Sequence, residues 1–338
     1  MKAKEYTFDA SYQPQVRTKT DTSRIMLDVI IALVPAMAVA VYQFGFRVLA
    51  LIVVSVLSCV FFEWGYRKLM KKPDSIGDLS ACVTGVLIAM VIPSGAPLWM
   101  PVVAAAFAMV VVKQLYGGIG KNFLNPALAS RAFLMASWPV IMTTWAVPKA
   151  LQGSVDATTM ATPLSYMKAG EALPDTLSTV NMLLGNVPGC IGEISAAALL
   201  IGGAYLLIRK VISWRIPTAF IGTVAVLTFI FPMHGASNFD WMLTNLLSGG
   251  LLLGAFFMAT DYSSSPVTLN GQLLFGFGCG ALTVLIRYFG GFPEGVSYAI
   301  LIMNLCAWAI DKGTRGRQFG VTKEDLKAAK KAAKEAKA

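Results

Sequence analysis

The feature that most constrains this chain is a series of uncharged apolar runs of nearly membrane-spanning length. A helix needs about 20 consecutive apolar residues to cross about 30 Å of hydrocarbon. Only 14% of the 338 residues are charged, against roughly 25% in a soluble domain. We therefore expect an all-α, polytopic integral membrane protein. Its net charge of +10 does not indicate nucleic acid, because the basic residues flank apolar segments, as membrane topology requires.

Ten apolar ranges predict about ten transmembrane helices. The third and sixth are short enough to be tilted or partly re-entrant. The ranges are 25–43, 47–66, 79–93, 97–115, 127–147, 193–208, 216–233, 243–260, 269–287 and 294–311.

The distribution of Lys and Arg predicts the orientation. With the N-terminus in the cytoplasm, 24 of the 28 Lys and Arg fall on the cytoplasmic side, including Lys113, Lys121 and Arg131 between the fourth and fifth ranges. Such an excess of basic residues is typical of cytoplasmic segments. It predicts that both termini are cytoplasmic and that the loop 148–192 lies on the outer face.

Two similar segments suggest an internal repeat. "YGGIGKNFLNPALASRAFLMASW" (116–138) and "YFGGFPEGVSYAILIMNLCAW" (288–308) each place a Gly-rich bend before the fifth helix of a half. Gly-rich bends before helices are also common by chance. Because five is odd, two five-helix halves would have opposite orientations, as in the inverted repeats of many transporters.

This repeat predicts five parts of the chain. They are a cytoplasmic N-terminal segment 1–24, a first five-helix repeat 25–147, an extracytoplasmic loop 148–192, a second five-helix repeat 193–311 and a basic cytoplasmic tail 312–338.

The longest polar interruption, "VDATTMATPLS" (155–165), is the first candidate site. Small polar residues with a proline are typical of a turn-forming loop, and that alternative stays open. Pro163 disfavours helical geometry at Thr162 and predicts an extended backbone there, in which the hydroxyl can be presented.

This segment resembles the flavinylation sequence of bacterial respiratory flavoproteins, D-G-x-[ST]-G-A-[ST], whose last residue is esterified to FMN. Ala157 and Met160 replace its two glycines. The positions that match are Asp156, Thr159, Ala161 and Thr162.

Three further segments, "SRIMLDVIIALVPA", "LYGGIGKNFLNPALASRAF" and "FFMATDYSSSPVT", resemble the NqrB/RnfD family, which includes the RnfD component of the Rnf electron-transport complex. They are more distantly similar to the NqrB component of the sodium-translocating NADH:quinone reductase. The resemblance covers nearly all of residues 20–320. It implies a ten-span fold with internal repeats in the bacterial cytoplasmic (inner) membrane, and covalent FMN on Thr162, attached by a flavin transferase.

Two further sites are predicted near the cytoplasmic face. Asn122 and Asn125 are close enough in sequence to converge on one ligand, and the resemblance implies a non-covalent riboflavin there. Asn125 before Pro126 is also typical of a helix cap, and both roles can hold together. Asp261, among small hydroxyls at a helix break, is either a cation or flavin contact or a plain helix-end carboxylate. The five cysteines form no CxxC motif, so we predict no metal site.

The resemblance implies a redox subunit, in which electrons pass from a partner's flavin to FMN on Thr162, with riboflavin near the inner face extending the path across the membrane. The resemblance implies an ion-translocating oxidoreductase (translocase) that couples electron transfer between ferredoxin and NAD to Na⁺ or H⁺ translocation. The chain shows no nicotinamide-binding fingerprint, no ferredoxin-type cysteine set and no acid–base dyad, so we expect other subunits to complete the active site. The alternatives are a small-solute transporter or channel, and a structural scaffold without flavin; the Thr162 loop discriminates between them.

Overall fold

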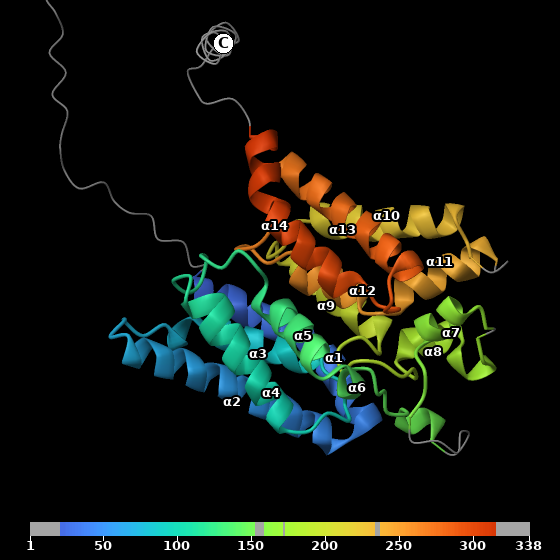
Figure 1. The fold of residues 1–338 in the computed structure, drawn as a ribbon, viewed down its shortest axis with the longest axis horizontal. Helices are drawn as coiled ribbons and strands as arrows, with labels where there is room; N and C mark the ends of the chain where they lie inside the picture. Colours follow the sequence, from blue (N-terminus) through green and yellow to red (C-terminus); the bar gives the residue numbers. More distant parts are fainter. Residues whose placement is uncertain (1–20, 153–158, 172, 234–236, 316–338) are drawn as a thin grey trace, which may run out of the picture.

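The computed structural model describes residues 21–152, 159–171, 173–233 and 237–315, which fold into helices joined by turns and loops (Figure 1). The first half contains α1 (Thr22–Phe44), α2 (Phe46–Leu69), α3 (Ser80–Met90), α4 (Trp99–Ala106), a π-helical continuation of α4 (Phe107–Gln114), α5 (Pro126–Ser137) and α6 (Pro139–Met142). The intervening segment contains α7 (Pro163–Ala169) and α8 (Thr179–Leu184). The second half contains α9 (Ala196–Ile208), α10 (Arg215–Ile230), α11 (Asn238–Leu247), α12 (Leu251–Leu253), its π-helical continuation (Gly254–Met258), α13 (Leu269–Phe289) and α14 (Val296–Thr314).

The predicted all-α membrane fold is confirmed for the described residues, since each of the ten apolar ranges contains helix. By length and composition, α1, α2 and α13 can each cross a membrane, and α11 with the helix Leu251–Met258 passes the same test as one span bent by 58°. Large apolar side chains such as Phe46, Leu57 and Leu305 are more than half exposed. A hydrocarbon solvent is the environment that such surfaces require.

Several boundaries differ from the prediction for identifiable reasons. The fifth range ends as helix at Met142 rather than at residue 147. It is interrupted at Trp138, because the following Pro139 lacks an N–H and disfavours helical geometry in the residue before it. The eighth range is broken because Gly249 and Gly250 adopt φ of +69° and +67°. The third and sixth ranges form helices of only 11 and 13 residues, as their short apolar runs predicted.

The two halves use the same helix pairings. In the first half α2 packs against α3 and α4, and in the second half α10 packs against α11 and α13. Across the halves, α1 packs against α9 and α5 against α14. These pairings support an internal repeat, while the opposite orientation of the halves stays a prediction.

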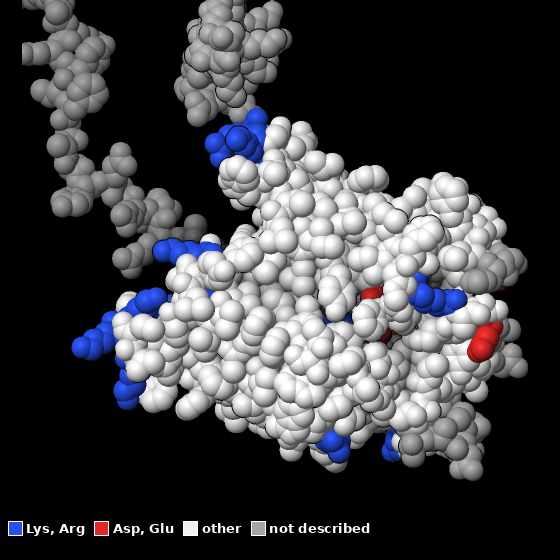
Figure 2. All heavy atoms as spheres, in the orientation of Figure 1, with Lys and Arg blue, Asp and Glu red and all other residues white. Residues whose placement is uncertain are grey.

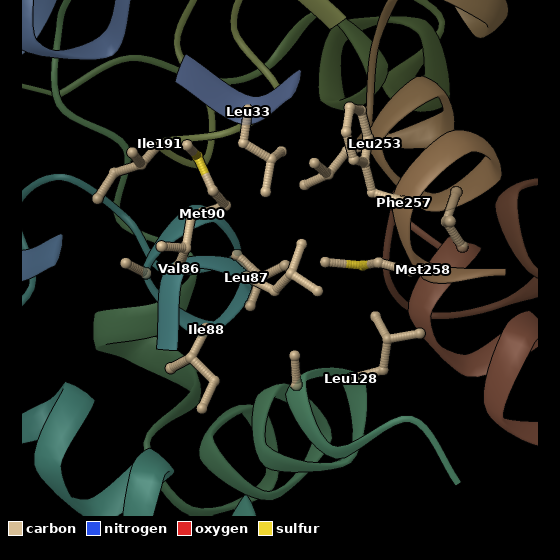
Figure 3. Close-up of a cluster of buried hydrophobic side chains, with 14 of the residues drawn as sticks. Leu33, Val86, Leu87, Ile88, Met90, Leu128, Ile191, Leu253, Phe257 and Met258 are labelled. Atoms are coloured by element: carbon tan, nitrogen blue, oxygen red, sulfur yellow. The ribbon is translucent and has the colours of Figure 1, made fainter. Parts of the chain in front are cut away.

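The halves meet in an apolar core built from α1, α3, α5 and the helix Leu251–Met258 (Figure 3). The α1–α9 contact depends on Gly202, where a Cβ atom would lie 2.1 Å from the carbonyl oxygen of Ala32. The segment before α9 is held at the end of α3, because the Gly192 N–H donates to the Met90 carbonyl at 2.8 Å. This pairing brings residues 190–193 into the interior.

The two ends of the described chain, at the start of α1 and the end of α14, lie away from α7 and α8 (Figure 1). Lys and Arg gather toward the end that carries both chain ends, with fewer along the rest of the visible face (Figure 2). The fold therefore separates a basic end, where the described part of the chain begins and ends, from the end that carries the Thr162 segment.

Candidate functional site

Thr162 lies at the start of α7, where it acts as the helix cap. Its backbone is extended, with φ −73° and ψ 157°, as Pro163 predicted. Its Oγ1 accepts a hydrogen bond from the Ser165 N–H at 3.3 Å and lies 2.8 Å from the Ser165 hydroxyl. Thr162 is only 4% exposed, so in this structure its hydroxyl is turned inward rather than toward the surface. The reason is that an N-cap threonine turns its oxygen toward the free N–H groups of the first helical turn.

The segment before Thr162 is anchored to the end of the first half. Thr159 forms an isolated antiparallel bridge with Ala146, and the Met160 N–H donates to the Trp145 carbonyl at 3.1 Å. Asp156 lies outside the described residues. The part of the predicted motif from Thr159 onward is thus held against residues 145–146.

A pocket of about 400 Å³ opens beside this segment, and we call it the Trp145 pocket. Arg131 and Glu294 contribute charge to its wall. Sites for small molecules and cofactors in proteins span roughly 300–1,000 Å³. The aromatic and loop residues that line the pocket are Trp145, Thr159, Met160, Ala161, Phe292 and Tyr298.

Helix α7 is fastened to the loop that carries Glu294. The Lys168 ammonium donates to the carbonyls of Gly290 and Phe292, the latter at 3.2 Å, and partial burial lowers the pKa of Lys168. On the apolar side of α7, Leu164 packs in a small cluster with Trp241. These contacts hold Thr162, at the start of α7, next to the Trp145 pocket.

A buried charged cluster lies at the pocket wall, and the sequence reasoning missed it. Arg131 donates to Glu294 Oε2 and lies 3.4 Å from Cys190 Sγ, and Glu193 Oε1 accepts from the Cys190 N–H at 2.8 Å. Arg131 was expected between two helices with the cytoplasmic charges; it instead lies inside α5 and is 8% exposed. The only sequence signal was an acidic residue at the first position of each of two predicted spans, in "PGCIGE" and "FPEG".

Asn125 lies at the start of α5 and makes three hydrogen bonds. Its Oδ1 accepts from the N–H groups of Ala127 and Leu128 at 3.0 and 3.3 Å. Its Nδ2 donates to the Met258 carbonyl at 3.2 Å, which joins the two halves of the chain. The predicted helix cap is confirmed, and these bonds engage both ends of the amide.

Asn122 and Asp261 lie against the same cavity as Asn125, which we call the Asn125 cavity. The Asn122 amide donates to the Leu124 carbonyl at 3.0 Å. Asp261 accepts from the hydroxyls of Ser263 and Ser264, the second at 3.0 Å, and burial raises the pKa of Asp261 against the effect of these bonds. The structure therefore brings together three predicted residues that are up to 139 positions apart in the sequence.

The Asn125 cavity encloses only about 100 Å³, less than a flavin ring system needs. It shares Ile119, Asp261 and Tyr262 with a larger groove of about 570 Å³, the Trp308 groove, which Trp308 and Phe123 also line. Both π-helical segments reach the cavity, one through Lys113 and the other through Phe256 and Phe257. Such segments occur often at functional sites.

Helix α5 connects the two candidate sites. Asn125 caps its first turn, and Arg131 extends from the same helix to the Trp145 pocket. Six residues of α-helix correspond to about 9 Å of rise. One rigid element therefore spaces the Asn125 cavity and the Trp145 pocket.

Most of the chain is similar to known proteins of one family. Residues 9–320 match the model of the NQR2, RnfD, RnfE family. The chain is 50% identical over 322 residues to the D subunit of the Na(+)-translocating ferredoxin:NAD(+) oxidoreductase complex of Acetobacterium woodii, covering 94% of this chain and 97% of the relative. It is 41% identical over 325 residues to the D subunit of the proton-translocating ferredoxin:NAD(+) oxidoreductase complex of Clostridium ljungdahlii, covering 94% and 97%.

Proposed function

Because this chain belongs to the NQR2, RnfD, RnfE family, we propose that it is the membrane redox subunit of an Rnf-type complex. The complex would couple electron transfer between ferredoxin and NAD to translocation of Na⁺ or H⁺. The names of the two relatives give sodium for one and protons for the other, so the proposal covers either ion. Other subunits would supply the ferredoxin and NAD sites, and this chain would carry electrons within the membrane.

We propose covalent FMN on Thr162, and the observation that carries this is the Trp145 pocket beside that residue. The pocket has the volume and the aromatic lining that a flavin ring requires. Thr162 would hold the phosphate, and Trp145, Tyr298 and Arg131 would line the ring. When bound, a flavin supplies one- and two-electron chemistry, while the protein sets its position and electrostatic surroundings.

Attachment would need a partner enzyme and a local opening. The Thr162 hydroxyl is nearly buried and caps α7. A flavin transferase could therefore reach it only before α7 docks or after its first turn opens. Lys168 is the side chain whose release would free α7 from the Glu294 loop.

We also propose a non-covalent riboflavin near the basic end of the molecule. The Asn125 amide is engaged in the helix cap, so it does not offer a free group. Because the Asn125 cavity is too small for the ring, riboflavin would lie in the adjoining Trp308 groove and reach toward Asn122 and Asp261. This arrangement would leave the cap of α5 intact.

For the location, we propose the bacterial cytoplasmic membrane, with both termini inside and the Thr162 segment on the outer face. The excess of Lys and Arg toward the end with both chain ends supports this orientation (Figure 2). The opposite placement of α7 and α8 in Figure 1 supports the outer location of the Thr162 segment.

The test of covalent FMN is flavin fluorescence of the protein band in a denaturing gel, after co-expression with a flavin transferase. We expect a fluorescent wild-type band and a dark Thr162→Ala band. The matched control is Thr144→Ala, which removes another pocket-lining hydroxyl, one that donates to the Val140 carbonyl in the preceding turn. It should remain fluorescent.

Two results would overturn this proposal. One is a dark wild-type band when a known flavinylated protein in the same cells is fluorescent. The other is a Thr162→Ala band as bright as the wild type, which would show attachment at another residue.

A further inference from the structure

Two carboxyl groups lie close to one another at the Trp145 pocket: Glu294 lines the pocket, and Glu193 is buried beside it. The Cys190 Sγ atom and one carboxylate oxygen each from Glu193 and Glu294 all lie within 4.8 Å of one another. Glu193 is 7% exposed, and the Glu294 side chain is 11% exposed. Two carboxylates this close and this buried repel each other strongly when both are ionised, so one of them tends to hold a proton.

In each carboxyl group, one oxygen accepts a hydrogen bond and the other has no hydrogen-bond donor among the described residues. Glu193 Oε1 accepts from the Cys190 N–H, and Glu294 Oε2 accepts from Arg131. Among the described residues, Glu193 Oε2 and Glu294 Oε1 are buried and have no hydrogen-bond partner. A buried polar atom without a partner costs about 1–3 kcal/mol. A single proton on one carboxyl group would provide the donor that both groups lack.

The surrounding charges do not remove the repulsion. Arg131 on α5 neutralises one carboxylate through its contact with Glu294. Arg287 on α13 is another nearby cation, but it donates to the carbonyls of Asn245, Ser248 and Gly249 at the helix break. Among the described residues it forms no ion pair with either glutamate within 4.0 Å. The cluster of Arg131, which pairs with Glu294, and of Glu193, which lies next to Glu294, is neutral only with one added proton.

We propose that Glu193 and Glu294 share one exchangeable proton and donate it to the redox group of the Trp145 pocket when that group is reduced. Glu294 lines the pocket, so it is the donating member, and Glu193 behind it holds the proton in reserve. For each electron delivered by a reduced electron-carrier protein, one O–H bond of the pair breaks and one proton passes to the reduced group. A proton from bulk solvent, carried by water at the pocket mouth, then returns the pair to its singly protonated state. The donation step rests on the proposed function; the shared proton does not.

The shared proton is tested by infrared spectroscopy of the purified protein. We expect a carboxylic-acid C=O band that shifts on exchange into D₂O and is absent in both Glu193→Gln and Glu294→Gln, because the remaining carboxylate then ionises against Arg131. The control is Glu171→Gln, which changes an exposed glutamate and should retain the band. Measuring the same band in Thr162→Ala protein keeps this test separate from the presence of FMN.

The donation step is tested by the pH dependence of the flavin midpoint potential in the intact complex. We expect the slope with pH to be shallower in both glutamine variants than in the wild type and in Glu171→Gln. The shared proton would be overturned if well-folded wild type lacked the carboxylic-acid band, or if both glutamine variants retained it. Loss of the wild-type band on adding sodium at constant pH would also overturn it. Equal slopes in all four proteins would overturn the donation while leaving the FMN proposal standing.

Discussion

Replacing Asn125 with alanine separates the two roles that the sequence leaves open for it, helix cap and flavin contact. The side chain is 2% exposed and makes three hydrogen bonds. Two of them cap α5, and the third reaches the Met258 carbonyl in the other half. If these bonds are its role, the substitution should cost stability and leave a bound riboflavin in place.

The cost can be worked out bond by bond. Loss of an Asn N-cap to alanine destabilises by about 1 kcal/mol. Loss of the buried bond to Met258 adds about 1 kcal/mol. We therefore expect Asn125→Ala to lower the free energy of unfolding by about 2 kcal/mol, and Asn125→Ser, which keeps an oxygen at the cap, by about half as much.

The measurement is unfolding in mixed micelles with increasing denaturing detergent, followed by circular dichroism, together with the riboflavin content of each purified variant. Asn122→Ala is the matched control, because the Asn122 amide donates to the Leu124 carbonyl two residues away and does not join the two halves. It should lower riboflavin content and change stability less than Asn125→Ala. A stable Asn125→Ala protein that has lost its riboflavin would refute the cap reasoning.

Two further substitutions test the packing and the buried charges. Gly202→Ala should destabilise by about 1–3 kcal/mol, because its Cβ would clash with the Ala32 carbonyl, while Gly222→Ala, with nothing within 4 Å, should be neutral or slightly stabilising. Equal effects of the two in the same unfolding titration would contradict this. Lys113→Met should cost about 3–5 kcal/mol, because Glu63 is fully buried and its carboxylate lies 3.1 Å from the ammonium. Adding Glu63→Gln to that variant should recover most of the loss in the same titration, and no recovery would show that the charge pair is not the cause.

The positions of the helices were predictable because they depend on composition along the chain. Apolar runs placed α1 and α2 within a few residues of their observed bounds. The bounds failed where backbone chemistry overrode hydropathy, at Pro139 and at the break made by Gly249 and Gly250. The proline and the glycines were visible in the sequence, but a hydropathy pattern does not account for their effect on backbone geometry.

The site was predictable where one local segment decides the geometry. Pro163 predicted the extended backbone of Thr162, and Asn125 before Pro126 predicted the cap of α5. The burial of the Thr162 hydroxyl was missed, because capping depends on how α7 begins and on what α7 packs against. A short polar segment does not contain that information.

By itself, the sequence determined that this chain is an α-helical membrane protein of the NQR2, RnfD, RnfE family, since apolar length and local motifs suffice for both. Only the tertiary structure decided which charges meet. Arg131 and Glu294 are 163 residues apart, and nothing local to either residue indicates the other. They meet because α5 packs against α14, and this packing depends on the side-chain contacts of the whole core. The charged wall of the Trp145 pocket is therefore a property of the fold rather than of any segment.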